Sequence, residues 1–195
     1  MVRTTRRLLL LLGLAGAAAC ADGGLSESPA SPADDPLELA RAAAAADGEE
    51  VPSLDEVARY ASNPGVKGVE RARATIGPDG GSLRLRDFEV IVPAGAVDRD
   101  TKFEIMILPE PARDAHAWAR FKPHNQQFAV PVVLRVPFAT TESAGSEDAH
   151  VLWWNHSLWE ELPTTVTEDG RLETTTDHFS VYATQRMRGI TMVGG

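Results

Sequence analysis

The six residues DHFSVY, 177–182, contain the side chains of this chain best suited to nucleophilic chemistry. A serine hydroxyl attacks a carbonyl once a base takes its proton, and His178 stands two positions before Ser180. In a β-strand these two residues share a face about 6.5–7 Å apart along the backbone, which is beyond direct hydrogen-bond reach. The alternative is a final strand in which Phe179 and Val181 point into a core and His178, Ser180 and Tyr182 form its outer or edge face.

Tryptophan rings offer a second kind of site, because flat aromatic rings stack on sugars. Trp153 and Trp154 are adjacent, so in a strand they face opposite ways and one of them belongs to a core. Trp159 follows a turn at 155–157 and can pair with either ring across a hairpin. Trp118 stands in a stretch without a strand pattern and is the tryptophan that we expect to be exposed. Trp118 and Trp159 are therefore the candidate rings for a carbohydrate-binding surface.

Metal and cofactor chemistry finds little support in the residue pattern. The histidines do not have the spacing of metal ligands, and a single cysteine cannot complete a set of ligands. The histidines are His116, His124, His150, His156 and His178. The sequence contains no P-loop, no GxSxG nucleophile motif and no dinucleotide fingerprint. We therefore expect no metal, no cofactor and no ordinary enzymatic turnover.

The first twenty residues are typical of an export signal. Arginines at positions 3, 6 and 7 precede the apolar run 8–19, which is too short to span a bilayer. Three alanines lead into Cys20, the only cysteine. The pattern resembles a bacterial lipoprotein signal peptide (1–20), in which the cysteine is diacylated and becomes the new N-terminus. The alternative is an ordinary secretory signal that leaves a free thiol behind.

The residue after Cys20 is Ala21 rather than aspartate, and in the enterobacterial sorting pattern that this resembles such a lipoprotein passes to the outer membrane. The predicted location is therefore the cell envelope, with the membrane as a partner through the lipid anchor. The whole chain has a net charge of −9, and removing the signal removes three arginines and no acid. This negative charge excludes nucleic acid as a partner. The partners that remain are an envelope protein or a glycan.

Residues 21–66 form an acidic, low-complexity segment. It contains ten acidic residues against two arginines, so it repels itself and should act as an extended, flexible tether. A short helix is possible at 53–62, where Ser53 is a candidate N-cap with Glu56 at the capping-box position. Such a helix has a narrow apolar stripe that includes Val57 and could dock on the domain that follows.

Residues 67–188 show a different pattern, in which apolar and polar side chains alternate. The alternation is clearest in FEVIV (88–92), KFEIMI (102–107) and VVLRVPF (132–138), and it predicts half-buried strands. Turn-forming residues rich in glycine, proline and aspartate separate the runs. Short strands at intervals of about ten residues are typical of an antiparallel β-sandwich. The predicted fold class is therefore all-β, with a short tail at 189–195.

Within this domain, the stretch 74–109 resembles the ZU-five domain, the module shared by zonula occludens proteins, netrin receptors and ankyrins and common in bacterial exported proteins. The matching features are Ile76-Gly77, the pair Gly80-Gly81, and VPAGA at 92–96 between two alternating strands. The glycine pair permits positive φ at a hairpin, and VPAGA closes a buried strand and reverses the chain. The resemblance continues more loosely to residue 184 and ends on the HFSVY motif. Residues 111–125 match poorly and read as a loop.

The resemblance implies one possible reaction. Some relatives that carry a second sandwich domain cut themselves between Phe and Ser of the HFS motif by an N-to-O acyl shift. Carried over here, the bond is Phe179–Ser180 and Ser180 is the nucleophile. Such a shift requires a strained peptide, a base and backbone donors for the oxyanion. The relatives also use an upstream histidine, for which His150 and His156 are the candidates here, and this chain is too short for the second domain.

The sequence therefore predicts a lipid-anchored cell-envelope protein whose ZU-five-like β-sandwich is a non-catalytic binding or structural module. Its expected contact surface is the sandwich edge and the loop around Trp118. Two alternatives stay open, namely a single-turnover, self-cleaving module cut between Phe179 and Ser180, and a carbohydrate-binding module.

Overall fold

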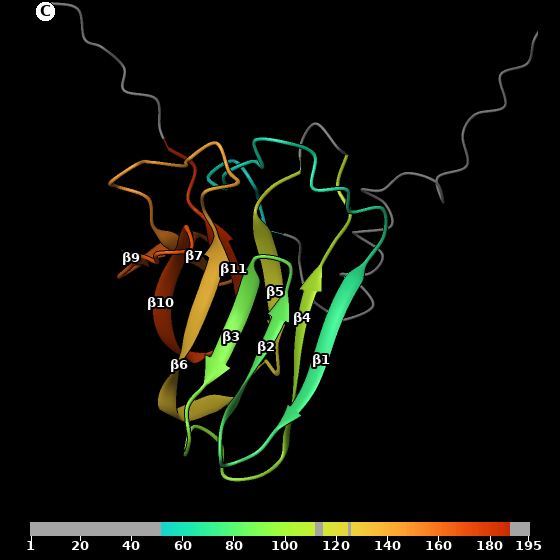
Figure 1. Ribbon diagram of the computed structural model, residues 1–195, viewed down its shortest axis with the longest axis vertical. Coiled ribbons are helices and arrows are strands. Elements are labelled where there is room, and N and C mark those ends of the chain that lie inside the picture. Colours follow the sequence, from blue (N-terminus) through green and yellow to red (C-terminus); the bar gives the residue numbers. More distant parts are fainter. Residues whose placement is uncertain (1–51, 112–114, 125, 188–195) are drawn as a thin grey trace, which may run out of the picture. The chain divides into compact units, whose positions relative to one another are not determined.

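The structure is a computed structural model that describes residues 52–111, 115–124 and 126–187 (Figure 1). All of them belong to the second of two compact units, Ser31–Gly195. The signal peptide predicted at 1–20 with Cys20, the predicted tether up to residue 51 and the predicted tail 189–195 lie outside the described residues. The described residues form eleven strands and no helix. Accordingly, no helix in this part of the chain has the length and apolar character needed to cross a bilayer.

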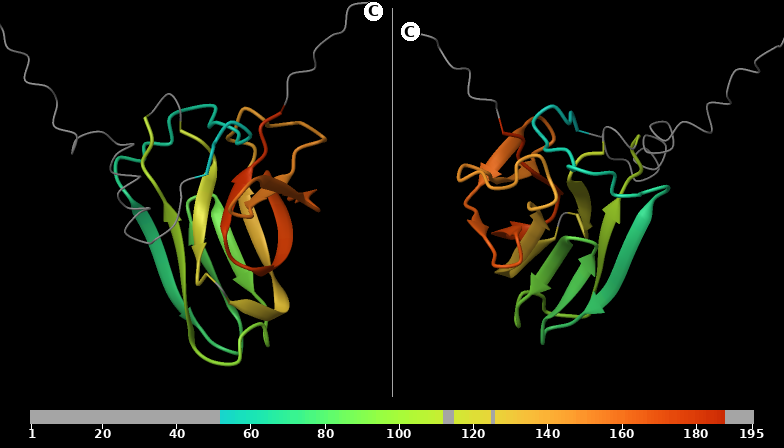
Figure 2. Two further views of the ribbon diagram at one scale, coloured as in Figure 1. Left: turned by 180° about the vertical axis from the view of Figure 1, so that it is seen from behind. Right: turned by 45° about the horizontal axis from the view of Figure 1, so that its top comes forward.

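The strands form two antiparallel sheets, as the alternating pattern predicted (Figure 2). The six-stranded sheet contains, in spatial order, β1 (Glu70–Ile76), β4 (Thr101–Ile107), β5 (Trp118–Lys122), β11 (Val181–Thr184), β7 (Val151–Trp154) and β8 (Trp159–Leu162). The five-stranded sheet contains β2 (Gly81–Leu85), β3 (Phe88–Val92), β6 (Gln127–Pro137), β10 (Arg171–His178) and β9 (Thr165–Val166).

The two sheets share one hydrophobic core. Every second residue points into it in β3, in β4 from Phe103 and in β6 from Val132, so the alternation predicted for these stretches is confirmed; the set is Phe88, Val90, Val92, Phe103, Ile105, Ile107, Val132, Leu134 and Val136. These side chains are at most 5% exposed. Burial of apolar side chains from both sheets is the main force that holds a sandwich together.

The glycine pair marks a crossing between sheets, not the hairpin that we predicted. β1 pairs with β4 and β2 pairs with β3, so the turn at 77–80 carries the chain from one sheet to the other (Figure 1). Gly80 has φ +80°, and a Cβ there would lie 2.5 Å from the carbonyl oxygen of Val92. A side chain is therefore excluded at this position, both by the backbone conformation and by the close approach of β3.

The six-stranded sheet is covered on both faces. On the face away from the core, a second apolar cluster includes Met106, Leu108, Trp118, Leu152, Trp154, Trp159, Val181 and Ala183. Val57 packs at this cluster and is completely buried. Residues 52–62, which we call the N-terminal strap, thus form part of a third layer over this sheet.

The strap is extended, and the helix predicted at 53–62 is wrong. The amide of Ala58 donates to the carbonyl of Thr184, and the amide of Ala117 donates to the carbonyl of Ala58, both at 2.8 Å. Isolated bridges also join Val57 to Gln185 and Arg59 to His116. The strap's backbone therefore bonds mainly to the ends of distant strands. The local turn, in which the amide of Val57 donates to the carbonyl of Leu54 at 3.0 Å, does not continue into a helix. Folded structure begins well before residue 67.

The loop predicted at 111–125 contains a strand. β5 lies between β4 and β11 inside the six-stranded sheet, and Trp118 is its first residue. Four of its five residues are buried, because the core covers one face and the outer cluster covers the other. A strand that is buried on both faces does not alternate, and this strand was missed for that reason.

Candidate functional site

The HFS motif lies at the corner where the chain passes from β10 to β11, and so from the five-stranded to the six-stranded sheet. Phe179 occupies the core, as predicted, and is 3% exposed. Its ring packs on Phe128, Phe103 and Phe121, with centroid distances of 4.8, 5.6 and 5.7 Å. The aromatic side chain therefore anchors the corner between the sheets.

Ser180 is buried and fully engaged at this corner. Its hydroxyl donates to the carbonyl of Trp154 at 2.6 Å, and its own carbonyl accepts from the amide of Phe121 at 3.0 Å. These contacts tie β11 to β7 and β5. A carbonyl oxygen orients the serine hydroxyl but cannot remove its proton, so this contact stabilises the fold without activating a nucleophile.

The histidines do not supply the missing base. His178 pairs with the Asp177 carboxylate, Nδ1 to Oδ1 at 2.9 Å, and this hydrogen bond holds the pKa of the Asp177 carboxyl below its ordinary value. The ring also packs edge-on against Trp153 at 4.8 Å. His150 meets Gln185 through its backbone, and His156 is exposed in the β7–β8 turn.

The backbone at the corner is relaxed with respect to φ. Among the residues that the structure describes, the non-glycine residues with positive φ are Arg86 and His156. Tyr182, expected on an outer face, is completely buried in the core, and Val181, expected in the core, belongs to the outer cluster. Its hydroxyl donates to the carbonyl of His178 at 2.8 Å, and burial raises the pKa of the phenol. The expectation failed because the chain changes sheets at 179–180, so one alternating pattern does not run through the motif.

The two tryptophans proposed as binding rings are both buried, so the exposed surface expected at Trp118 is wrong. Trp118 is 2% exposed and Trp159 is 7% exposed, because both belong to the outer cluster that the strap helps to cover. The Trp159 indole donates to the carbonyl of Ser53 at 2.6 Å. Trp159 pairs with Trp154 at 5.4 Å, and Trp153 and Trp154 pack against different clusters, as their adjacency predicted.

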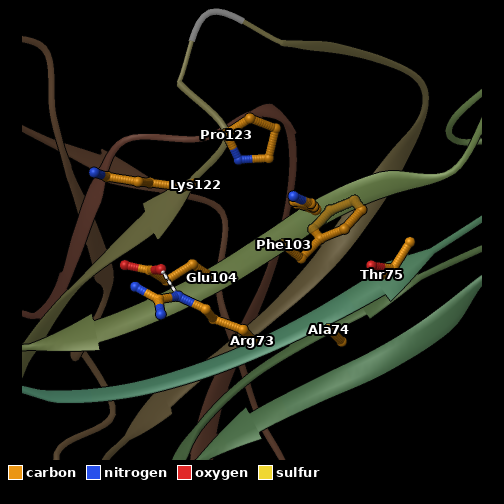
Figure 3. Close-up of a pocket in the computed structure, with 8 residues that line it drawn as sticks. Arg73, Ala74, Thr75, Phe103, Glu104, Lys122 and Pro123 are labelled. Atoms are coloured by element: carbon orange, nitrogen blue, oxygen red, sulfur yellow. Dashed lines mark hydrogen bonds and ion pairs between the residues drawn. The ribbon is translucent and has the colours of Figure 1, made fainter.

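A hollow that sequence reasoning missed lies on the six-stranded sheet at β1, β4 and β5 (Figure 3). It has a volume of about 520 Å³ and is lined by Arg73, Ala74, Thr75, Lys102, Phe103, Glu104, Lys122 and Pro123. Figure 3 shows Arg73 and Glu104 side by side, with Lys122 on the next strand. We call this feature the cationic hollow.

Strand register builds the charge of the hollow. Arg73 is opposite Glu104, and Glu104 is opposite Lys122, so the three side chains form a row across β1, β4 and β5. The Glu104 carboxylate bonds to Arg73 and lies 3.4 Å from Arg71. The Arg73 side chain is 67% exposed, and Lys102 is also exposed. Two arginines therefore pair with Glu104, and Lys102 and Lys122 lie on the same face of the sheet, within a chain of net charge −9.

A weak signal of this site was present in the sequence. The chain contains only three lysines, Lys67, Lys102 and Lys122, and two of them line the hollow. Alternation also places Arg71 and Arg73 on one face of a strand. Only the pairing of β1 with β4 and of β4 with β5 joins these residues into one surface.

Comparison with protein-family models and with curated proteins gave no match to this chain. Within 52–111, 115–124 and 126–187, no group of three or more histidine, cysteine, aspartate or glutamate side chains is placed to hold a metal ion. The arrangement on this part of the surface is suited to binding an anion.

Proposed function

We propose that this chain is a lipid-anchored, non-catalytic binding module of the bacterial cell envelope, with the cationic hollow as its contact surface. The observation that carries the proposal is the excess of positive charge in an open hollow on an acidic chain. An anionic group entering the hollow meets Arg73 and Lys102, whose side chains are exposed; Lys102 can donate charge-assisted hydrogen bonds, and Arg73, which bonds to Glu104 through Nε, can add further ones from the rest of its guanidinium.

The ZU-five-like interpretation of 74–109 is part of this proposal. Its strongest supporting feature is VPAGA, where β3 ends at Val92 and Gly95 adopts φ +80°. Binding through a surface on a rigid sheet agrees with a structural or adaptor role, and it requires no chemistry from the HFS corner.

Self-cleavage at Phe179–Ser180 is not the function that we propose. The Ser180 hydroxyl bonds to a carbonyl, His178 pairs with Asp177, and both Phe179 and Ser180 are 3% exposed. Because this bond is buried, water would also have to reach the ester before hydrolysis could occur. Carbohydrate stacking on Trp118 and Trp159 is likewise not proposed, because neither ring offers an open face.

Lipid attachment at Cys20 is proposed from the signal pattern. Thirty-one residues, 21–51, separate that cysteine from the described domain. Fully extended they would reach about 100 Å, and as a flexible chain they would hold the domain about 30 Å from its anchor on average. Either length lets the hollow meet partners near the membrane surface.

The anchor and the bond at 179–180 are tested together by intact mass of protein extracted from bacterial membranes. We expect one uncut chain that begins at an acylated Cys20, and a Cys20→Ala variant that no longer partitions into detergent. An unacylated chain, or a separate fragment 180–195 that is absent from Ser180→Ala, would refute the proposal.

The contact surface is tested by co-sedimentation of the Cys20→Ala protein with purified bacterial envelopes at low salt. We expect Lys102→Glu to reduce envelope retention severalfold, because it reverses one charge of the hollow. Lys67→Glu is the matched control, since Lys67 is exposed outside the hollow. Equal retention of the two variants would show that the hollow is not the contact surface.

A further inference from the structure

We propose that an acidic segment of this same chain, residues 34–50, docks in the cationic hollow and competes there with external partners. The segment contains six acidic residues and one arginine, for a net charge of −5. On the other side, Arg71, Arg73, Lys102 and Lys122 lie on the same face of the sheet as Glu104, and the formal charges of these five side chains sum to +3. The two charges are complementary.

The path of the chain favours this occupant. Residue 51 leads directly into the strap, which begins at the β8 side of the six-stranded sheet, where the carbonyl of Ser53 accepts from Trp159. The strap packs on the outer cluster of that sheet, and the hollow lies at the β1–β4–β5 side of the same sheet.

The distance to be crossed is short for the chain available. Four strand spacings separate β8 from β4, which is about 19 Å at roughly 4.8 Å each. An extended chain covers about 3.3 Å per residue, so some six residues are enough. The acidic positions 34–50 therefore include several that can reach the hollow.

Covalent linkage makes weak contacts sufficient. Exposed ion pairs are individually weak, so a free peptide of this sequence would bind poorly. A segment joined by a short flexible linker has an effective concentration in the millimolar range, which allows partial occupancy even by a weak ligand. Added salt screens exposed charges, so docking should be reversible and should weaken as the ionic strength rises.

An external anion is the less favoured occupant of the cationic hollow. It would approach a chain of net charge −9, whereas residues 34–50 are themselves a source of that charge and are already held nearby. Docking of residues 34–50 would regulate access to the surface assigned above, and to this extent it rests on the proposed function. An anionic partner would have to displace the segment before it could bind.

The scarcity of lysine makes the test specific. A water-soluble carbodiimide joins carboxylates to amines that are in contact, and the side-chain amines of the chain are Lys67, Lys102 and Lys122. In the full-length mature protein at low salt, we expect amide cross-links from Lys102 and Lys122 to acidic residues of 34–50, mapped by peptide mass spectrometry. Their yield should fall severalfold at 500 mM salt on the screening argument. Amide formation between Lys122 and Glu104, which are opposite each other, is the internal positive control.

Two kinds of variant complete the experiment. Arg73→Glu should reduce the segment cross-links severalfold, and Arg84→Glu should leave them unchanged, because Arg84 is exposed on β2 of the other sheet. The triple change Asp47→Asn, Glu49→Gln and Glu50→Gln removes three negative charges from the segment and changes no residue of the described domain. It should also reduce the cross-links, and it should increase retention on envelopes.

Absence of segment cross-links in the presence of the Lys122–Glu104 product would overturn the docking. So would cross-links that join two chains, which would make a second copy the occupant, or binding of anionic lipid vesicles that the triple variant leaves unchanged. The surface itself is judged separately. If docking fails while Lys102→Glu still reduces envelope retention severalfold, the contact surface stands without its internal competitor.

Discussion

Replacing Ser180 by alanine distinguishes packing from chemistry at the HFS corner. The change removes the hydroxyl that donates to the Trp154 carbonyl at 2.6 Å and retains the backbone bond from Phe121. A buried hydrogen bond contributes about 1 kcal/mol net, and a buried carbonyl left without its donor costs about 1–3 kcal/mol. Because the site is 3% exposed, water does not replace the lost donor. We expect the free energy of unfolding to fall by about 1–2 kcal/mol.

The assay is urea unfolding of the Cys20→Ala protein, followed by tryptophan fluorescence. The midpoint should decrease while the slope m stays constant, since the same surface is exposed on unfolding. Ser82→Ala on β2 is the matched control because Ser82 is exposed, and such surface changes stay within about 0.5 kcal/mol. A Ser180→Ala effect below that limit would refute the structural role of the hydroxyl. Accumulation of a fragment 180–195 in the wild-type protein alone would show that the residue is a nucleophile.

Three other perturbations test the layers and turns of the fold. Val57→Ala removes two buried methyl groups of the strap and should lower the free energy of unfolding by about 2 kcal/mol in urea. Val130→Ala, at a residue 39% exposed, should cost little. Equal effects would mean that the strap does not stabilise the domain. Gly80→Ala should cost more than about 1 kcal/mol in the same assay, because alanine is strained at φ +80°, and a neutral result would contradict the close approach of β3. The hydrogen bond from Arg171, with a second from Thr167, lowers the pKa of the Asp169 carboxyl to about 2. A carboxyl whose pKa is lowered in the folded state stabilises the fold at pH values above its ordinary pKa. This stabilisation is lost as the pH falls from about 4 to about 2. The urea midpoints of Asp169→Asn and wild type should therefore differ at pH 7 and converge as the pH falls across that range.

The sequence identified the strands that bury one face. In FEVIV and VVLRVPF, apolar residues alternate with polar ones, and the structure places Val90 and Leu134 in the core with Glu89 and Arg135 on the other face. Such alternation is a local property of the chain, because successive side chains of a strand point to opposite faces. The alternating pattern can therefore be recognised without knowing which distant residues pack against the strand.

The strands buried on both faces carried no such signal. β5 and β11 have almost no exposed residue, so WARFK was assigned to a loop and its Trp118 was expected in solvent. The burial of this outer face depends on the strap, whose Val57 docks on strands more than 45 residues away in sequence. Helical propensity at 53–62 was outweighed by hydrogen bonds from the strap to the strand ends.

The sequence by itself therefore determined the all-β class, the one-sided strands and the burial of Phe179, because each follows from side-chain periodicity and local turn chemistry. Tertiary structure alone decided which faces are covered, where the chain changes sheets at Ser180, and that Arg73, Glu104 and Lys122 stand in one row. Neighbours in a sheet are chosen by non-local pairing, and no pattern within a single strand records which strand will lie beside it.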